Sequence, residues 1–350
     1  MLRLLFLLLA TAAPVLCGGP LTLSVDPRTG AYAFGGSISL AGGPTSLRAN
    51  GQMLSTADGS LALDGAPTPL QGTDSALGPY TGYQMSYNSQ LLVTRIKLFA
   101  GQLFLFEQHF PRGVNGTAAH PGGNATEDSY ALSSAFPALI LPPAPWAAPA
   151  APDLAAACFS GGLLDPLPDW PMIPQVWRFN NESADLAAAL GFMASAVAVY
   201  DGAMNVLSLA PLDNFLTTHA AIGALEPGPG LALGVGASAR VEALPAGFTS
   251  RAIVQGGSSL NDTVFALGSA LLAVAGKPRL GVLEVEDIGT KFLSYFTDNG
   301  AYYYYHTEAE NVTYQRTMID AVASLQAQGV PVQTLQFDVR GRRARIPLPR

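Results

Sequence analysis

The sequence is poor in cysteine, in charge and in long apolar runs, and each shortage excludes a class of protein. Only Cys17 and Cys158 occur in 350 residues, so no disulfide framework can stabilise the fold. Charged residues make up 12% of the chain, the formal net charge is −7, and no long basic run precedes the last dozen residues. This balance excludes a nucleic-acid-binding protein. The hydrophobic content of 49% excludes a disordered chain.

Motifs for several kinds of chemistry are also missing. The four histidines are scattered without metal-ligand spacing, and no cluster of carboxylates indicates a calcium site. There is no GxSxG nucleophile elbow, no GxGxxG turn and no Walker sequence. We therefore expect neither a metal nor a cofactor.

The N-terminus, MLRLLFLLLATAAPVLCGG, is typical of a signal peptide. It has a positive charge at Arg3, a short apolar core and a small-residue end. The apolar run is shorter than the roughly 20 residues that span a bilayer, so we expect cleavage after residues 1–17 and no membrane span in the mature chain. Five Asn-X-Ser/Thr sequons fit a secreted protein, or one in the lumen of the secretory pathway or a vacuole. The predicted glycosylation sites are Asn115, Asn124, Asn181, Asn261 and Asn311.

Short β-prone runs separated by turn residues fill most of residues 18–277. The runs before Pro111 are LTLSV, AYAFGGSISLAG, GSLALDG, YTGYQMSYN, LLVTRIKLFAG and QLFLFEQHF. Strands at this spacing, without helical patterns between them, predict antiparallel sheets packed as a sandwich. Asp201-Gly202 predicts the turn of a hairpin. A helical period over Thr263 to Gly276 predicts a helix that ends the sandwich near Lys277.

The stretch from Phe292 to Asp338 predicts a strand, a helix and a second strand. Thr313 is the expected N-cap of the helix and Gly329 its stop. The flanking runs, FLSYF and VQTLQF, should pair in parallel within a buried sheet. Asp298 and Asp338 follow the carboxyl ends of these strands, which is the edge where barrel enzymes carry their chemistry.

The motif TDNGAYYYY, followed by GVPVQTLQFD, resembles the opening of the catalytic barrel in a eukaryotic branch of glycoside hydrolases related to α-galactosidases and raffinose synthases. Upstream, LSLAPLDNFLTTH and the stretch from TGYQMSYN to PRGVNGT resemble the sandwich domain that precedes that barrel. The resemblance implies a supersandwich-like antiparallel β-sandwich over 18–277, followed by a truncated (β/α)8 TIM barrel. Residues 278–338 would be the first βαβ unit of this barrel.

The resemblance also implies a secreted α-glycosidase-like protein whose substrates are α-linked saccharides such as galactosides. The family's two catalytic aspartates lie on later barrel strands, so we expect no catalytic residue in this chain. Asp298, Asn299 and Asp338 correspond to the first two strand ends, where acidic residues bind sugar hydroxyls. A carboxylate suits that role because it accepts hydrogen bonds from two hydroxyls. Capping and turn formation are the alternative roles of these residues.

Three functions therefore stay open at this point: an α-glycosidase-like enzyme, a sandwich that binds carbohydrate or a partner without catalysis, and a fragment without independent function. A complete barrel takes roughly 250 residues, far more than follow Lys277. Residues 339–350, VRGRRARIPLPR, form a basic tail of different composition. We interpret this tail as a gene-model artefact, with a genuine short isoform as the alternative. The oligomeric state cannot be predicted from these features.

Overall fold

The computed structural model describes residues 20–119, 132–141, 154–160, 175–178, 194–224, 231–279, 291–297 and 306–336. This part of the chain is rich in strands, most of them in antiparallel sheets. The chain divides into two compact units, Met1–Lys277 and Pro278–Arg350.

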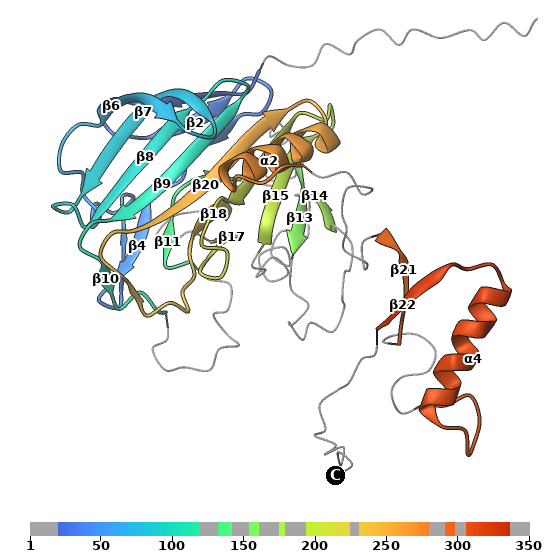
Figure 1. Ribbon diagram of the computed structural model, residues 1–350. Helices are drawn as coiled ribbons and strands as arrows, with labels where there is room; N and C mark the ends of the chain where they lie inside the picture. The colour runs from blue at the N-terminus through green and yellow to red at the C-terminus, as the bar shows by residue number, and fades with distance from the viewer. Residues whose placement is uncertain are drawn as a thin grey trace, which may run out of the picture. The chain divides into compact units, whose positions relative to one another are not determined.

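A twelve-stranded sheet is the main layer of the first unit (Figure 1). In spatial order its path runs through β12 (Ala138–Ile140), β18 (Leu231–Ala237), β17 (Thr218–Ala224), β15 (Ala194–Asp201), β16 (Val206–Pro211), β20 (Phe248–Gly257), β9 (Leu103–Phe110), β8 (Leu92–Leu98), β7 (Gly78–Tyr87) and β6 (Thr68–Asp74). Off this path, β13 (Leu154–Ser160) pairs with β15, and β14 (Gln175–Arg178) pairs with β13. β20 pairs with both β9 and β16, so it joins strands from distant parts of the sequence into one sheet.

Short antiparallel sheets form the second layer. They are β1 (Thr22–Val25), β2 (Tyr32–Gly35) and β3 (Leu40–Ala41); β4 (Ser46–Ala49), β5 (Gln52–Ser55) and β11 (Ser134–Ala135); and β10 (Val114–Asn115) with β19 (Ala243–Leu244). Aromatic rings from both layers meet in the core: Phe34 lies 5.3 Å from Phe104, and Tyr32 lies 5.4 Å from Phe106, between ring centroids. The same hydrophobic cluster includes Leu154 and Leu207, so the chain before and after the proline-rich stretch at residues 139–153 shares one core.

Helix α2 (Leu260–Val274) covers part of the other face of the large sheet (Figure 1). Leu267 is buried there in a second hydrophobic cluster with residues of β9, β16 and β20. The helix begins three residues before the predicted Thr263, because the Ser259 hydroxyl accepts from the Asp262 N–H and caps an earlier turn. The helix ends at Val274, and Gly276, with φ of 62°, follows the C-cap Ala275. The Lys277 N–H then donates to Leu272 O at 2.9 Å, in a Schellman motif.

Some sequence predictions for this unit are confirmed, and the prediction of one strand was wrong. The Asp201 hairpin forms between β15 and β16. Residues 59–65, GSLALDG, form turns with an isolated bridge from Leu63 to Tyr87 rather than a strand. Here the Asp58 carboxylate accepts the Ser60 N–H and the Asn88 amide oxygen accepts the Ala62 N–H, both at 2.9 Å, so side chains take the place of a strand partner.

The second unit contains β21 (Leu293–Phe296), α4 (Tyr314–Ala327) and β22 (Val332–Gln336), and the two strands pair in parallel as predicted. Thr313 caps α4 by accepting the Arg316 N–H at 3.2 Å. Gly329, with φ of 78°, ends the helix, and the Val330 N–H donates to Leu325 O at 2.9 Å. The described part of this unit holds these two strands, so the barrel stays a prediction. Among the described helices, none combines the length and apolarity that crossing a membrane requires.

Candidate functional site

The shared carboxyl edge of β21 and β22 is the candidate substrate site. Phe296 lies opposite Gln336, the last pair in the parallel register. Parallel strands end at the same edge, so the chain leaves both strands side by side. In the sequence, Asp298 and Asp338 each come two positions after this last pair. These two residues and Asn299 lie outside the described residues, so their predicted contacts with sugar stay predictions.

Hydroxyl groups hold this small unit together. The side chains of Ser294 and Thr334 share a hydrogen bond across the two strands. On α4, the buried Thr317 hydroxyl donates to Thr313 O and accepts the N–H of Glu308, both at 3.2 Å. The loop before α4 is thereby tied to the first turn of the helix.

The electrostatics of α4 are those of an exposed helix. Arg316 and Asp320, one turn apart, form an ion pair with Nε and Oδ2 at 2.6 Å. The Asp320 carboxylate raises the pKa of Arg316, so the guanidinium stays charged. An exposed pair of this kind contributes little to stability. In the described ranges, no group of three His, Cys, Asp or Glu side chains is arranged to hold a metal ion.

The prediction that this sheet is buried was wrong for the described residues. Large apolar side chains of the unit are exposed: Phe292, Leu293, Phe296, Ile319 and Leu335. A parallel sheet is buried when helices cover both of its faces, and α4 is the one helix described beside these strands. The side chains that should line a barrel interior or its helix layer thus face solvent here.

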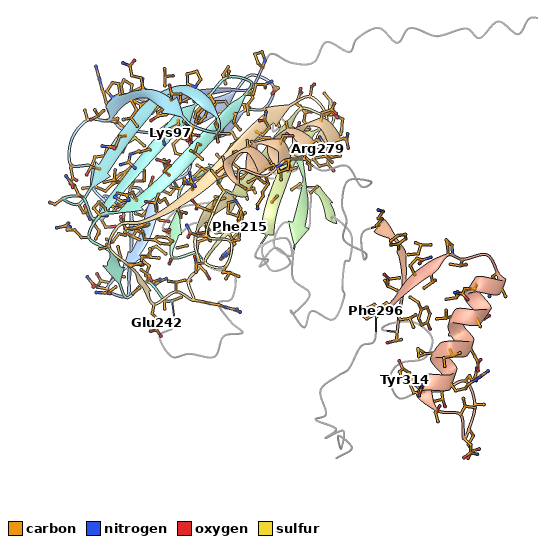
Figure 2. The ribbon with its side chains drawn as sticks, viewed as in Figure 1. Lys97, Phe215, Glu242, Arg279, Phe296 and Tyr314 are labelled. Carbon is orange, nitrogen blue, oxygen red and sulfur yellow. The ribbon has the colours of Figure 1, made fainter. Side chains whose placement is uncertain are left out.

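A charged cluster on the large sheet was missed by sequence reasoning. Glu107 of β9, with its side chain 8% exposed, accepts from Lys97 Nζ at 2.8 Å and lies 3.6 Å from Arg95 Nη1. On the neighbouring β20, Arg251 Nε lies 2.6 Å from Asp213 Oδ2. Figure 2 labels Lys97 on this sheet. Each charge has an opposite charge beside it, so these ion pairs fit a role in joining β8 to β9, and β20 to the chain after β16, better than a catalytic one.

Three of the five predicted glycosylation sites can be located. Asn115, Asn261 and Asn311 are exposed, on β10, on the first turn of α2 and before α4 respectively. Asn124 and Asn181 lie outside the described residues. Exposure is necessary for a glycan in the folded protein, so these three positions remain compatible with the prediction.

Neither a family model nor a curated protein sequence matches this chain. Among solved structures, the chain is similar to the α-N-acetylgalactosaminidase NagBb of Bifidobacterium bifidum in its GalNAc complex, with 11% identity over 91% of this chain and 51% of that chain, at a TM-score of 0.47. It is also similar to a glycoside hydrolase family 97 enzyme of Pseudoalteromonas sp. strain K8 in complex with acarbose, with 9% identity over 68% of this chain and 34% of that chain, at a TM-score of 0.39. The chain thus spans about half the length of NagBb. Similarity at this level assigns neither an activity nor a substrate.

Proposed function

We propose that this chain is the sandwich and first βαβ unit of a secreted α-glycosidase-like protein, related to α-galactosidases and raffinose synthases, that binds α-linked saccharides. The parallel pairing of β21 with β22 carries the proposal, because both strands end at the same sheet edge, two residues before Asp298 and Asp338 in the sequence. Barrel enzymes bind substrate at that edge. The motifs TDNGAYYYY and GVPVQTLQFD, which contain Asp298 and Asp338, supply the family resemblance.

In this proposal Asp298, Asn299 and Asp338 bind sugar hydroxyls. An ionised carboxylate accepts from two hydroxyl donors, and an amide side chain can both donate and accept. A retaining glycosidase also needs a nucleophile and a proton donor on either side of the glycosidic bond. The proposal assigns neither role to a residue of this chain, so saccharide binding without turnover is the expected behaviour.

The domain division that accompanies the proposal is a signal peptide over 1–17, the sandwich over 18–277, the barrel start over 278–338 and a basic tail over 339–350. The leader and the sequons support passage through the secretory route, with N-glycans on the mature protein. The final location would be extracellular or vacuolar.

A titration of the full chain with saccharides tests the proposed site. Melibiose carries an α-linked galactosyl group and maltose an α-linked glucosyl group, and isothermal titration calorimetry would measure the affinity for each. Hydrogen bonds to a charged group contribute about 1.5–3 kcal/mol, so Asp298→Asn and Asp338→Asn should each weaken binding about tenfold or more. Asp320→Asn, on the exposed face of α4, is the matched control and should keep the wild-type affinity. Unchanged affinity in the Asp298→Asn/Asp338→Asn double variant would contradict the proposal.

An activity assay then separates binding from catalysis. The chain should not hydrolyse aryl α-galactosides or α-glucosides, whereas a version extended through a full barrel should, because acid catalysis and nucleophilic attack each supply orders of magnitude in rate. Equal activity in both proteins would mean that a carboxylate of this chain is catalytic.

A further inference from the structure

The loop between β16 and β17, Asp213–Thr217, presents two large apolar side chains to solvent. Phe215 is 64% exposed and Leu216 is 98% exposed, the highest values among the large hydrophobic side chains described in the sandwich unit. Figure 2 labels Phe215 on the first unit. Isolated exposed apolar residues are common on proteins. Two adjacent ones need an explanation when the backbone that carries them is held in one conformation, as it is here.

Hydrogen bonds to β20 fix the loop. The Asp213 carboxylate accepts from the Arg251 backbone N–H at 3.0 Å and from Arg251 Nε at 2.6 Å. Asn214, in the left-handed region with φ of 54°, donates from Nδ2 to Thr249 O at 2.9 Å. Its own carbonyl accepts the N–H groups of Thr217 and Thr218, both at 2.8 Å. Phe215 is therefore carried on a pre-organised turn, which lowers the entropy cost of binding a ligand.

The side chains that hold the loop are polar. The side chains of Asp213 and Arg251 are 25% and 30% exposed, so both can reach a ligand while they pair with each other. Thr249, which also holds the loop, shares a hydrogen bond of 2.7 Å with His109 Nδ1. A stable protein interface buries about 800 Å² on each partner around an apolar core. Two apolar side chains among polar ones are too little for such a core, which disfavours a protein partner.

A sugar ring fits this surface better. One face of a pyranose presents C–H groups that pack on an aromatic ring, while its hydroxyls point outward to polar side chains. We infer that Asp213–Thr217 is a saccharide-binding subsite of the sandwich, in which Phe215 stacks on a sugar ring and the Asp213–Arg251 pair contacts its hydroxyls. The inference rests on the proposed function for the class of ligand, and it places this contact on residues that the proposed sheet-edge site does not include.

Affinity electrophoresis of the full chain in gels containing galactomannan or soluble starch tests the subsite. Phe215→Ala should weaken retention by at least one polysaccharide about tenfold, because the stacking surface is lost. Phe215→Trp should keep or strengthen retention, since it preserves an aromatic face. Leu216→Ala is the matched control: it removes the more exposed apolar neighbour and should leave retention unchanged. Thermal melting of each variant verifies that the chain remains folded.

The outcomes separate this inference from the proposed function. The inference is overturned if neither polysaccharide retards the wild-type protein. It is also overturned if Leu216→Ala loses as much retention as Phe215→Ala, because that result would indicate a general apolar surface. If the Asp298→Asn/Asp338→Asn double variant is no longer retained and Phe215→Ala is retained like the wild type, the proposed function stands and the subsite is refuted. Retention lost with Phe215→Ala alone supports the subsite whether or not the sheet-edge site binds sugar.

Discussion

Replacing Tyr32 with phenylalanine should destabilise the sandwich at neutral pH and should do so less in alkali. The buried Tyr32 hydroxyl donates to Ala138 O at 2.8 Å and accepts the Ala138 N–H at 2.7 Å, so it joins β2 of one layer to β12 of the other. Ala138 O keeps a second donor in the Gly43 N–H at 2.7 Å. The Ala138 N–H loses this acceptor in the variant. A buried group left without its partner costs about 1–3 kcal/mol, which is the expected loss of unfolding free energy at pH 8.

The pH dependence follows from the raised pKa of the same group. Burial raises the pKa of Tyr32 well above its ordinary value of 10.0. In alkali the unfolded chain therefore loses this proton before the folded chain does, and stability falls as pH rises above 10. With an unfolded-state pKa of about 10, the loss reaches about 1.4 kcal/mol at pH 11. Phenylalanine has no proton to lose, so the cost of Tyr32→Phe should shrink by that amount between pH 8 and pH 11.

Urea unfolding of both proteins at the two pH values measures this difference. Phe136→Leu is the control, because the Phe136 ring lies 5.7 Å from the Tyr32 ring and has no ionisable group. Its cost should be the same at pH 8 and pH 11. If Tyr32→Phe also lowers the unfolding free energy by the same amount at pH 8 and pH 11, Tyr32 is not a buried phenol with a raised pKa.

Further predictions concern packing, charge and modification. Gly236→Ala should lower the unfolding free energy measured in urea by about 3 kcal/mol or more, because the added Cβ would lie 1.7 Å from the Ser134 carbonyl oxygen. Gly268→Ala on α2, where the added Cβ meets nothing within 4 Å, should raise the unfolding free energy by about 0.5–1 kcal/mol. Glu107→Gln should cost about 1–3 kcal/mol, since Lys97 loses its carboxylate on a partly buried face; Asp320→Asn on exposed α4 should cost nothing measurable by the same assay. Protein expressed in a eukaryotic host should lose apparent mass on removal of N-glycans, and an unchanged mass with an intact N-terminus would contradict the secretory prediction.

Elements with a local cause were predictable from the sequence. Thr313 and Gly329 determine where α4 begins and ends, and both act on backbone groups within a few residues. The hairpin at Asp201 is local in the same way. The sequence predicts a strand over residues 59–65 because apolar residues alternate with other residues there. The Asn88 side chain that accepts the Ala62 N–H and helps to turn this segment comes from far along the chain.

Features that depend on distant pairing could not be predicted. Glu107 and Arg251 look like ordinary strand residues, and their opposed positions follow from the register of β9 with β20. β6 was missed because TPLQGTD contains Pro, Gly and Asp, which are rare inside sheets; the strand lies at the end of the sheet path, where such residues are tolerated. The rigidity of the Phe215 loop likewise comes from bonds to β20.

A crystal structure of the full chain with galactose or melibiose would show where the sugar binds. We expect the sugar at the carboxyl edge of β21 and β22, with its hydroxyls hydrogen-bonded to Asp298 and Asp338. Sugar bound elsewhere with that edge empty, or these two aspartates occupied in capping turns and pointing away from the edge, would contradict it.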